Sequence, residues 1–280
     1  MKIRIIVDST ADTTPEVAAR VTVVPLTICF GEKEYVQGVD ITNSEFYEKL
    51  VESDVLPSTS QATPYAFERV FQEAVEAEEY VVAITLSARL SGTYQSAVLA
   101  AAEFPGKVFV VDSGSVAIGT GILTEYALRL LDDGLSAEEI AEKLEEQKKR
   151  VHVLAMLDTL EYLKKGGRIS KTVAFAGELL AIKPVVGLDG GEIKILGKAR
   201  GSRQANNLLV KEIQDAGGVD FSCPLLLGYT GLSDALLQKY IRDSATLWDE
   251  NREQLPYTLI GSVVGTHAGP GAVAVAFFCK

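Results

Sequence analysis

The sequence has few of the residues that build disulfide frameworks and zinc sites. Its three cysteines, Cys29, Cys223 and Cys279, stand far apart with no Cys-x-x-Cys spacing, and only two histidines occur, His152 and His267. An odd number of separated cysteines argues against a disulfide scaffold and favours a reducing compartment. A zinc site would need carboxylates for most of its ligands, so we expect no metal.

Long apolar runs and an excess of positive charge are absent too. No stretch is long enough to span a membrane, and the apolar run near the N-terminus is too short for a signal peptide. We therefore expect a cytoplasmic protein. The 27 Lys and Arg residues against 38 Asp and Glu give a net charge of −11. This charge disfavours general nucleic-acid binding, because phosphate neutralisation drives that affinity.

The sequence also lacks the motifs of common catalytic sites. It contains no GxxxxGK[ST] nucleotide loop and no GxSxG nucleophile elbow. The Gly119-Thr120-Gly121 segment lies inside a helical pattern and does not follow a strand, so it predicts no dinucleotide site. We therefore expect the protein to use no cofactor.

What is present is ordinary globular composition, with 47% hydrophobic and 23% charged residues in a chain of 280. In the first half, apolar runs of strand length alternate with helical patterns. The predicted strands are residues 3–7, 21–28, 80–85, 108–111 and 151–156. Capping boxes at Thr42/Glu45 and Ser136/Glu139, and Thr63 before Pro64, predict three helix starts. This alternation predicts a parallel α/β domain over residues 1–157.

The second half has a different pattern. Two apolar runs, 184–188 and 192–196, flank Asp189-Gly190-Gly191 and predict a hairpin. The other predicted strands are 224–228, 257–264 and 271–278. The predicted helices are 161–166, capped by Asp158, and 171–181, 203–216 and 233–245. We therefore expect a smaller α+β domain with a largely antiparallel sheet over residues 158–280.

Two clusters of hydroxyl side chains precede predicted helices in the first half. One is the run of residues 57–64, with Thr59 and Ser60, and the other is residues 87–96, with Ser91, Gly92 and Thr93. Helix N-termini at the carboxyl ends of parallel strands offer unpaired N–H groups, and hydroxyls would complete a neutral site for a carboxylate. Helix capping alone explains the same residue types, so both interpretations stay open.

Three further segments are candidates for a site. Asp8 follows the first strand, although a turn that ends the strand explains it equally well. His267 lies in a glycine-rich segment, residues 265–271, which we predict to be a loop between two strands. The segment from Lys164 to Arg203 contains nine basic residues and only three acidic ones, which gives it a local charge of +6. A charge run is usually a solvated face, but a reversal this large favours a docking surface for an acidic partner or a phosphate group. Arg168 and Arg200, each beside a glycine, are expected to reach outward.

Taken together, these segments resemble the motifs of the DegV family of bacterial fatty-acid-binding proteins. The matching runs are Asp8-Ser9-Thr10-Ala11-Asp12, Thr59-Ser60-Gln61, Leu90 to Ala97, Val110 to Ser113, Leu160 to Lys171, and Thr266-His267-Ala268-Gly269-Pro270-Gly271. They follow the family's order over nearly the whole chain. One departure is that the family's usual Thr-Ser-Gln-Pro-Ser reads Thr59-Ser60-Gln61-Ala62-Thr63-Pro64 here, which leaves the acyl-chain preference open.

The resemblance implies a two-domain protein that buries one long-chain fatty acid, such as palmitate or stearate, in an apolar tunnel. It implies that hydroxyls at Thr59 and Ser91 bind the carboxylate, within a site that includes Ser60, Gly92, Thr93 and His267. It further implies a subunit without chemistry of its own, which presents the lipid to a separate ATP-dependent kinase subunit that makes acyl phosphate. The family's docking residues correspond to Arg168 and Arg200, with Lys164 and Lys165 nearby. Transient contact with a membrane surface is compatible with this role.

Two alternatives from other functional classes accompany this expectation. The first is a serine acyl hydrolase that uses Ser91 as nucleophile and His267 as base. The second is a regulatory module whose basic segment binds nucleic acid or an acidic protein.

Overall fold

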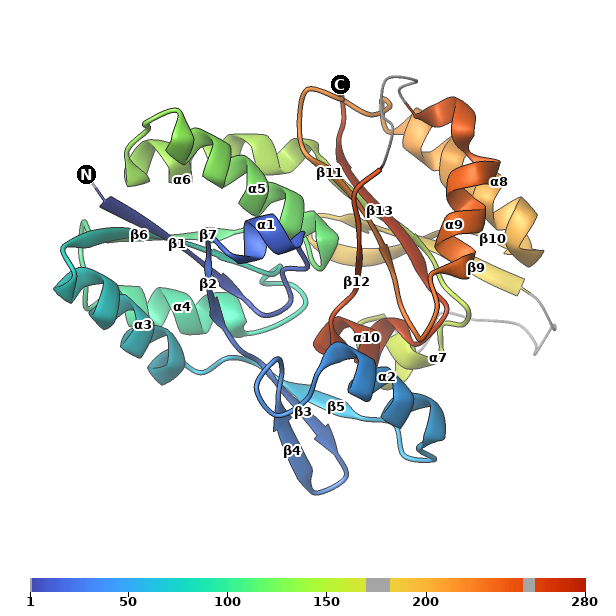
Figure 1. Cartoon of the computed structure of the whole chain (residues 1–280), viewed down its shortest axis with the longest axis horizontal. Helices are drawn as coiled ribbons and strands as arrows, with labels where there is room; N and C mark the ends of the chain where they lie inside the picture. Colours follow the sequence, from blue (N-terminus) through green and yellow to red (C-terminus); the bar gives the residue numbers. More distant parts are fainter. Residues whose placement is uncertain (1, 170–181, 249–254) are drawn as a thin grey trace.

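The first half of the chain builds a parallel sheet between two layers of helices. The computed structural model describes residues 2–169, 182–248 and 255–280. The strands of the first sheet, in spatial order, are β2 (Thr22–Val24), β1 (Lys2–Asp8), β6 (Glu79–Thr85) and β7 (Val108–Asp112), all parallel. Helices α3 (Pro64–Glu76) and α4 (Thr93–Ala101) cover one face, while α5 (Ile118–Asp132) and α6 (Ala137–Gln147) cover the other (Figure 1).

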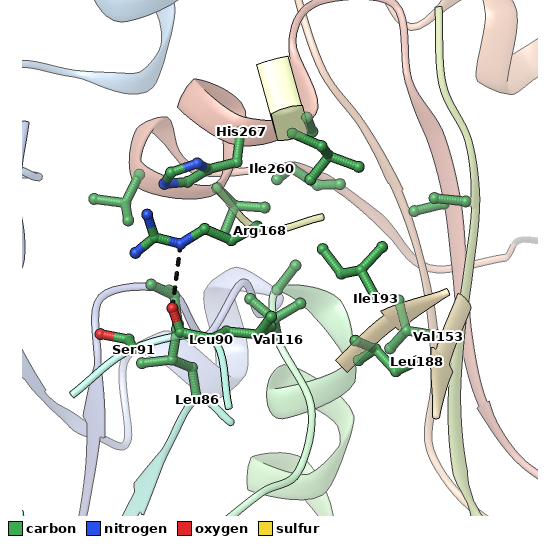
Figure 2. Close-up of a pocket in the computed structure, with 18 of the residues that line it drawn as sticks. Leu86, Leu90, Ser91, Val116, Val153, Arg168, Leu188, Ile193, Ile260 and His267 are labelled. Atoms are coloured by element: carbon green, nitrogen blue, oxygen red, sulfur yellow. Dashed lines mark hydrogen bonds between the residues drawn. The ribbon is translucent and has the colours of Figure 1, made fainter. Parts of the chain in front are cut away.

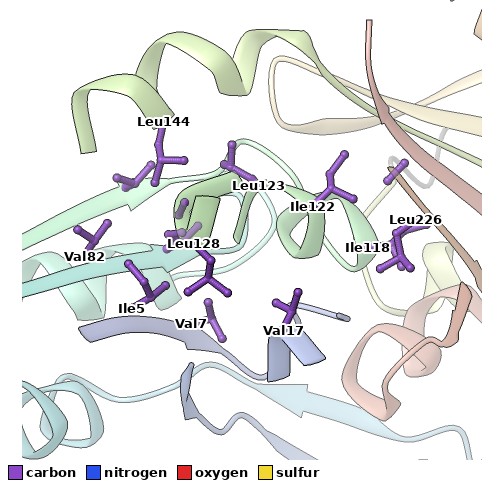
Figure 3. Close-up of a cluster of buried hydrophobic side chains, with 14 of the residues drawn as sticks. Ile5, Val7, Val17, Val82, Ile118, Ile122, Leu123, Leu128, Leu144 and Leu226 are labelled. Carbon is purple, nitrogen blue, oxygen red and sulfur yellow. The ribbon is translucent and has the colours of Figure 1, made fainter. Parts of the chain in front are cut away.

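Alternation along the strands supplies both cores of this sheet. In β1, Ile5 and Val7 pack with α5 and α6, whereas Ile6 packs with the aromatic residues of α3. Figure 3 shows the first cluster, in which Ile5, Val7 and Val82 face Leu123 and Leu128. Both faces are buried, and this explains why the sequence of these strands is continuously apolar.

The second sheet has six strands and is antiparallel except at one edge. In spatial order they are β10 (Glu192–Arg200), β9 (Ile182–Asp189), β8 (Val151–Met156), β13 (Val273–Phe278), β11 (Leu225–Tyr229) and β12 (Tyr257–Leu259). Helices α8 (Gly201–Asp215) and α9 (Ala235–Asp243) cover one face, and α5 from the first half lies against the other (Figure 1). The protein is therefore a mixed α/β fold whose two larger sheets are one parallel and one largely antiparallel, as the sequence predicts.

Strand β8 does not close the first sheet, contrary to the prediction. It pairs antiparallel with β13 and β9 in the centre of the second sheet. Its apolar, β-branched sequence specifies a buried strand, but it does not specify the partner. Sheet membership thus changes between β7 and β8, and the predicted division into residues 1–157 and 158–280 stays a prediction.

The predicted strand over residues 21–28 is two strands, because β2 ends at Val24 and the chain breaks at Pro25. Its second part, β3 (Thr27–Phe30), forms a separate antiparallel sheet with β4 (Lys33–Val36) and β5 (Ser58–Ser60). Proline lacks the N–H group that a central strand needs for its ladder. This small sheet matters for the site because β5 carries Thr59.

The helix starts predicted from capping residues in the first half are confirmed. Thr42 and Glu45 form a capping box at α2 (Asn43–Glu52), Ser136 and Glu139 form one at α6, and Thr63 caps α3. Asp158, in contrast, does not cap α7 (Glu161–Lys165); it forms an ion pair with Lys183. The predicted helix over 171–181 falls entirely outside the described residues. The remaining short elements are α1 (Pro15–Ala18) and the 3₁₀ turns Lys148–Arg150 and Ala245–Leu247.

The predicted strand over residues 257–264 is also wrong in its second part. Only β12 is extended, and the chain then turns into α10 (Ser262–Ala268), so His267 lies in the last turn of a helix and not in a loop. The β-branched pair at 263–264 favours a strand locally, but tertiary packing decides otherwise. Gly265 lets α10 approach α2, because a Cβ there would overlap with the Tyr47 hydroxyl.

Candidate functional site

A cavity lies between the carboxyl ends of the parallel strands and the face of the second sheet that α8 and α9 leave uncovered. It holds about 940 Å³ of space free of protein atoms, its open mouth included. Figure 2 shows Ser91, Arg168 and His267 at one end, and Val153, Leu188 and Ile193 toward the other. The cavity is thus polar at one end and apolar along the rest, which is the usual lining of a small-ligand site.

Thr59 and His267 meet at the polar end. Thr59 comes from β5 and His267 from α10, and Thr59 Oγ1 lies 2.9 Å from His267 Nε2. These residues are 208 positions apart in the chain. The hydrogen bond therefore joins the small sheet of the first half to the last helix, directly on the cavity wall.

His267 is held in its neutral form. Burial, together with the nearby positive charge of Arg168, lowers its pKa from 6.5 to about 4. Its Nδ1 atom is buried and has no hydrogen-bond partner among the described residues. Gly166 permits this placement, because a Cβ at that position would overlap with the imidazole ring. At neutral pH, the side chain can donate one hydrogen bond and accept another, without adding charge.

Ser91 supplies a second hydroxyl at the polar end. Its Oγ lies 3.0 Å from Thr93 Oγ1 and accepts a hydrogen bond from the Thr93 N–H at 3.3 Å. Gly92 is the N-cap of α4, and a Cβ there would overlap with the side chain of Gln61. Ser60 and Ser91 line the cavity together with Thr59 and His267, whereas Gly92 and Thr93 lie behind Ser91 and are absent from the lining.

Gln61 and Arg168 lie at the polar end of the cavity, although neither was predicted as a ligand-binding residue. Gln61 lines the cavity, and its amide donates to Ser96 Oγ at 3.1 Å. Arg168 was expected to reach outward but turns into the cavity, where its Nε donates to the Leu90 carbonyl at 3.2 Å and a terminal N–H donates to the Gly166 carbonyl at 2.6 Å. Burial lowers the pKa of Arg168 from its usual value, yet the guanidinium stays charged. Gln61 has a signal in the sequence, since it follows Thr59 and Ser60, but the direction of Arg168 depends on tertiary packing.

The other predicted docking residues lie outside this cavity. Lys165 pairs with Glu161 on the surface of α7, at 2.7 Å. Arg200 is exposed at the end of β10, where the ladder pairs it with Ile182, far along the hairpin from its turn. Lys164 also lies on α7, one turn before Arg168. The structure thus places Arg168 and Arg200 at different sites and not in one cluster.

The carboxylates at the strand ends have structural roles. Asp8 is fully buried; one of its oxygens accepts hydrogen bonds from the N–H and hydroxyl of Thr10, at 2.9 and 2.6 Å, and the other accepts from the Leu86 N–H at 2.7 Å. Burial raises its pKa. Asp112 accepts from the N–H groups of Gly114 and Ala88, at 2.9 and 3.2 Å. Both side chains shape the loops that carry the cavity lining.

The arrangement does not support the hydrolase alternative. Among the described residues, the partner of His267 is Thr59, and the hydroxyl of Ser91 interacts with Thr93. A nucleophilic serine needs its base within hydrogen-bonding reach, and no such Ser91–His267 pair is formed.

The described parts of the chain also contain no group of three His, Cys, Asp or Glu residues that could hold a metal ion. No helix in those parts is both long and apolar enough to cross a bilayer.

Comparison with known proteins gives the family. The family described as "Uncharacterised protein, DegV family" matches residues 2–280. The chain belongs to the DegV family. A DegV domain-containing protein of Caldanaerobacter subterraneus is 35% identical over 282 aligned residues, covering 99% of this chain and 98% of the relative.

Solved DegV structures share the fold over the whole chain. A DegV family protein from Thermus thermophilus, described for its fatty acid binding, superimposes with a TM-score of 0.87 at 33% identity, covering 99% of this chain and all of that one. A stearic-acid-binding protein from Eubacterium ventriosum has the same TM-score at 28% identity, covering 99% of this chain and 97% of that one. Both of these solved proteins are described as binding fatty acids.

Proposed function

We propose that this DegV protein binds one long-chain fatty acid, with the acyl chain in the apolar part of the cavity and the carboxylate at Thr59, Ser91 and His267. The observation that carries the proposal is a polar cluster at one end of an otherwise apolar cavity. In this proposal, Ser60 completes the lining of the carboxylate site, while Thr93 and the N-cap Gly92 hold Ser91 in place from outside the lining. In this proposal the protein binds the fatty acid as a ligand and needs no cofactor, and palmitate and stearate are suitable candidates.

The chemistry of the polar end suits a carboxylate. A buried carboxylate must be hydrogen-bonded, because an unpaired buried charge is costly. The hydroxyls of Thr59 and Ser91 can each donate, and Arg168 supplies a positive charge at the same end. His267 is neutral at neutral pH, so Arg168 is the positively charged one of these two side chains.

The apolar walls would supply most of the binding energy. A palmitate chain has about 15 methylene and methyl groups, and burying each is worth about 0.8 kcal/mol, or about 12 kcal/mol before ordering costs. This gross gain exceeds what any single hydrogen bond contributes. The cavity therefore selects for a long acyl chain, and the polar end fixes its direction.

We further propose that the protein presents the carboxylate to a separate ATP-dependent kinase subunit, which makes acyl phosphate. Two of the lining residues at the polar end, Ser60 and Gln61, are exposed, so a carboxylate held there would lie close to solvent. Arg200, with Lys164 and Lys165, would form part of the docking surface. In this proposal, the protein is a non-catalytic subunit located in the cytoplasm.

The test of the carboxylate site is the double variant Thr59→Ala, Ser91→Ala. Losing two hydrogen bonds to a charged group should weaken fatty acid binding about 100-fold or more. Ser58→Ala is the matched control, because Ser58 lies on the same strand but does not line the cavity. Unchanged lipid occupancy and acyl-phosphate formation in the double variant would rule out the proposed carboxylate site.

The kinase role is tested separately from lipid binding. With the kinase subunit and ATP, Arg200→Ala should slow acyl-phosphate formation while leaving the bound fatty acid in place. Arg168→Ala should affect both steps, because Arg168 lies in the cavity. Acyl-phosphate formation at the unaltered rate in Arg200→Ala would remove Arg200 from the docking surface.

A further inference from the structure

The floor of the cavity is one face of the second sheet, and its side chains are set by strand alternation. Ala155 on β8 and Ala274 on β13 line the cavity, while their neighbours Leu154 and Val275 pack into the core on the opposite face. The two alanines are directly paired across the ladder. Paired residues project from the same face of a sheet, so the two methyl groups lie side by side on the cavity floor.

The same row of the sheet has larger groups on both sides of this pair. Val186 is paired with Ala155 from β9 and also lines the cavity. On the other side, Gly228 of β11 is paired with Ala274, and a Cβ at Gly228 would lie 2.9 Å from Ile260. The missing side chain lets Ile260, another lining residue, sit on the sheet beside Ala274. Val186 and Ile260 therefore form two walls, and the alanines form the bottom of a trough between them.

The accessibility of Ala155 agrees with an open trough, whereas Ala274 is only 3% exposed. Strand β8 lies inside the sheet, between β9 and β13, where an alanine is normally buried. Ala155 is nevertheless only partly buried. Because Ala155 lines the cavity, this accessible surface faces the space inside. The two alanine methyl groups leave open the space that larger aliphatic side chains would fill at these positions.

The trough lies away from the polar end. Val153 precedes Ala155 by two residues on the same face of β8, and Figure 2 shows Val153 near Leu188 and Ile193, opposite to Ser91 and His267. A chain held by its carboxylate at the polar end reaches the trough with its distal carbons. Contacts there respond to the length of the chain and not to its head group.

We propose that the Ala155–Ala274 pair determines the acyl-chain length that the cavity accepts, by leaving a trough for the distal half of an unbranched long chain. This inference rests on the proposed fatty acid binding and adds the residues that set specificity. Valine at either position would fill the trough, whereas glycine would deepen it. In this proposal, short chains end before the trough, so the substitutions discriminate between chain lengths.

The test is competition between chain lengths. Wild-type protein, Ala155→Val and Ala274→Val are each incubated with an equimolar mixture of myristate and stearate, and the bound lipids are extracted and quantified by mass spectrometry. We expect the ratio of bound stearate to myristate to fall about 10-fold or more in both valine variants, the scale of discrimination that one or two methyl groups give in an apolar pocket. Ala155→Gly and Ala274→Gly should move the ratio the other way, and they also serve if a valine variant does not fold.

Ala276→Val is the matched control. Ala276 is a buried alanine on β13, two residues beyond Ala274 on the same face, and it does not line the cavity. It should lose stability through overpacking but keep the wild-type ratio. A ratio that is unchanged in both the valine and glycine variants, or shifted equally in Ala276→Val, would overturn the inference. Absence of any bound fatty acid in the wild-type protein would instead overturn the proposed function.

Discussion

At the residue scale, the site depends on a histidine that stays uncharged. A protonated imidazole at the polar end would carry a second positive charge beside Arg168, and burial removes the solvent that would stabilise it. The neutral ring instead forms a hydrogen bond with Thr59 and leaves Nδ1 unpaired among the described residues. His267 therefore positions the Thr59 hydroxyl as well as lining the cavity.

This protonation state gives a pH dependence of stability. The folded protein holds His267 with a pKa near 4, compared with 6.5 for an unperturbed histidine, so the unfolded state binds the proton more readily. Stability should fall as pH decreases from about 6.5 to about 4, by up to about 3 kcal/mol from this group. Urea unfolding of wild-type protein and His267→Gln at several pH values isolates the contribution as a difference. Parallel curves for the two proteins would contradict the assignment.

The residue types at the site could be predicted from the sequence, but the direction in which each side chain points could not. Hydroxyls before helices, such as Thr59 and Ser91, give a signal that does not depend on distant contacts. The direction of Arg168 depends on the Leu90 carbonyl, which lies 78 residues earlier in the chain. No local pattern encodes that contact.

At the scale of elements, α10 connects the site to the first half of the chain. Asp12 accepts a hydrogen bond from the Gly261 N–H at 2.7 Å, and Tyr47 donates to the Ile260 carbonyl at 2.9 Å. Both contacts fix the start of α10, and His267 lies at its end. The helix is thereby held against the cavity from two sides.

Asp12→Asn tests how this contact is made. Burial raises the pKa of Asp12 to about 8, so the folded protein keeps its proton where the unfolded chain has lost it. Wild-type stability from this group should therefore decline as pH rises from about 4 to about 8. Asparagine keeps the acceptor for Gly261 and cannot ionise, so Asp12→Asn should gain stability relative to wild type over this range. Chemical unfolding at pH 5 and pH 8 measures the difference, and a constant difference would refute it.

The elements predicted correctly are those with local signals. Capping residues fixed the starts of α2, α3 and α6, and Asp189-Gly190-Gly191 marked the turn between β9 and β10. The errors occur where partners decide the structure. β8 joins the second sheet because β13 and β9 lie beside it, and residues 262–268 form a helix because Asp12, Asn43 and Tyr47 hold its start.

At the scale of the whole molecule, the cavity is a product of the junction between the two halves. The first half contributes the ends of its parallel strands and the hydroxyls, and the second half contributes an apolar sheet face and α10. Neither half alone encloses the space. The sequence predicts both architectures, but the tunnel itself was expected only from the resemblance to the DegV family, because a cavity depends on the docking of distant surfaces.

The most direct test of the account is to identify what the cavity holds. Purified protein is denatured and extracted with organic solvent, and the extract is examined by mass spectrometry. We expect about one long-chain fatty acid per chain, either as purified or after incubation with a mixed fatty acid pool. An extract without fatty acid, both before and after that incubation, would contradict the central claim that this cavity is a lipid site.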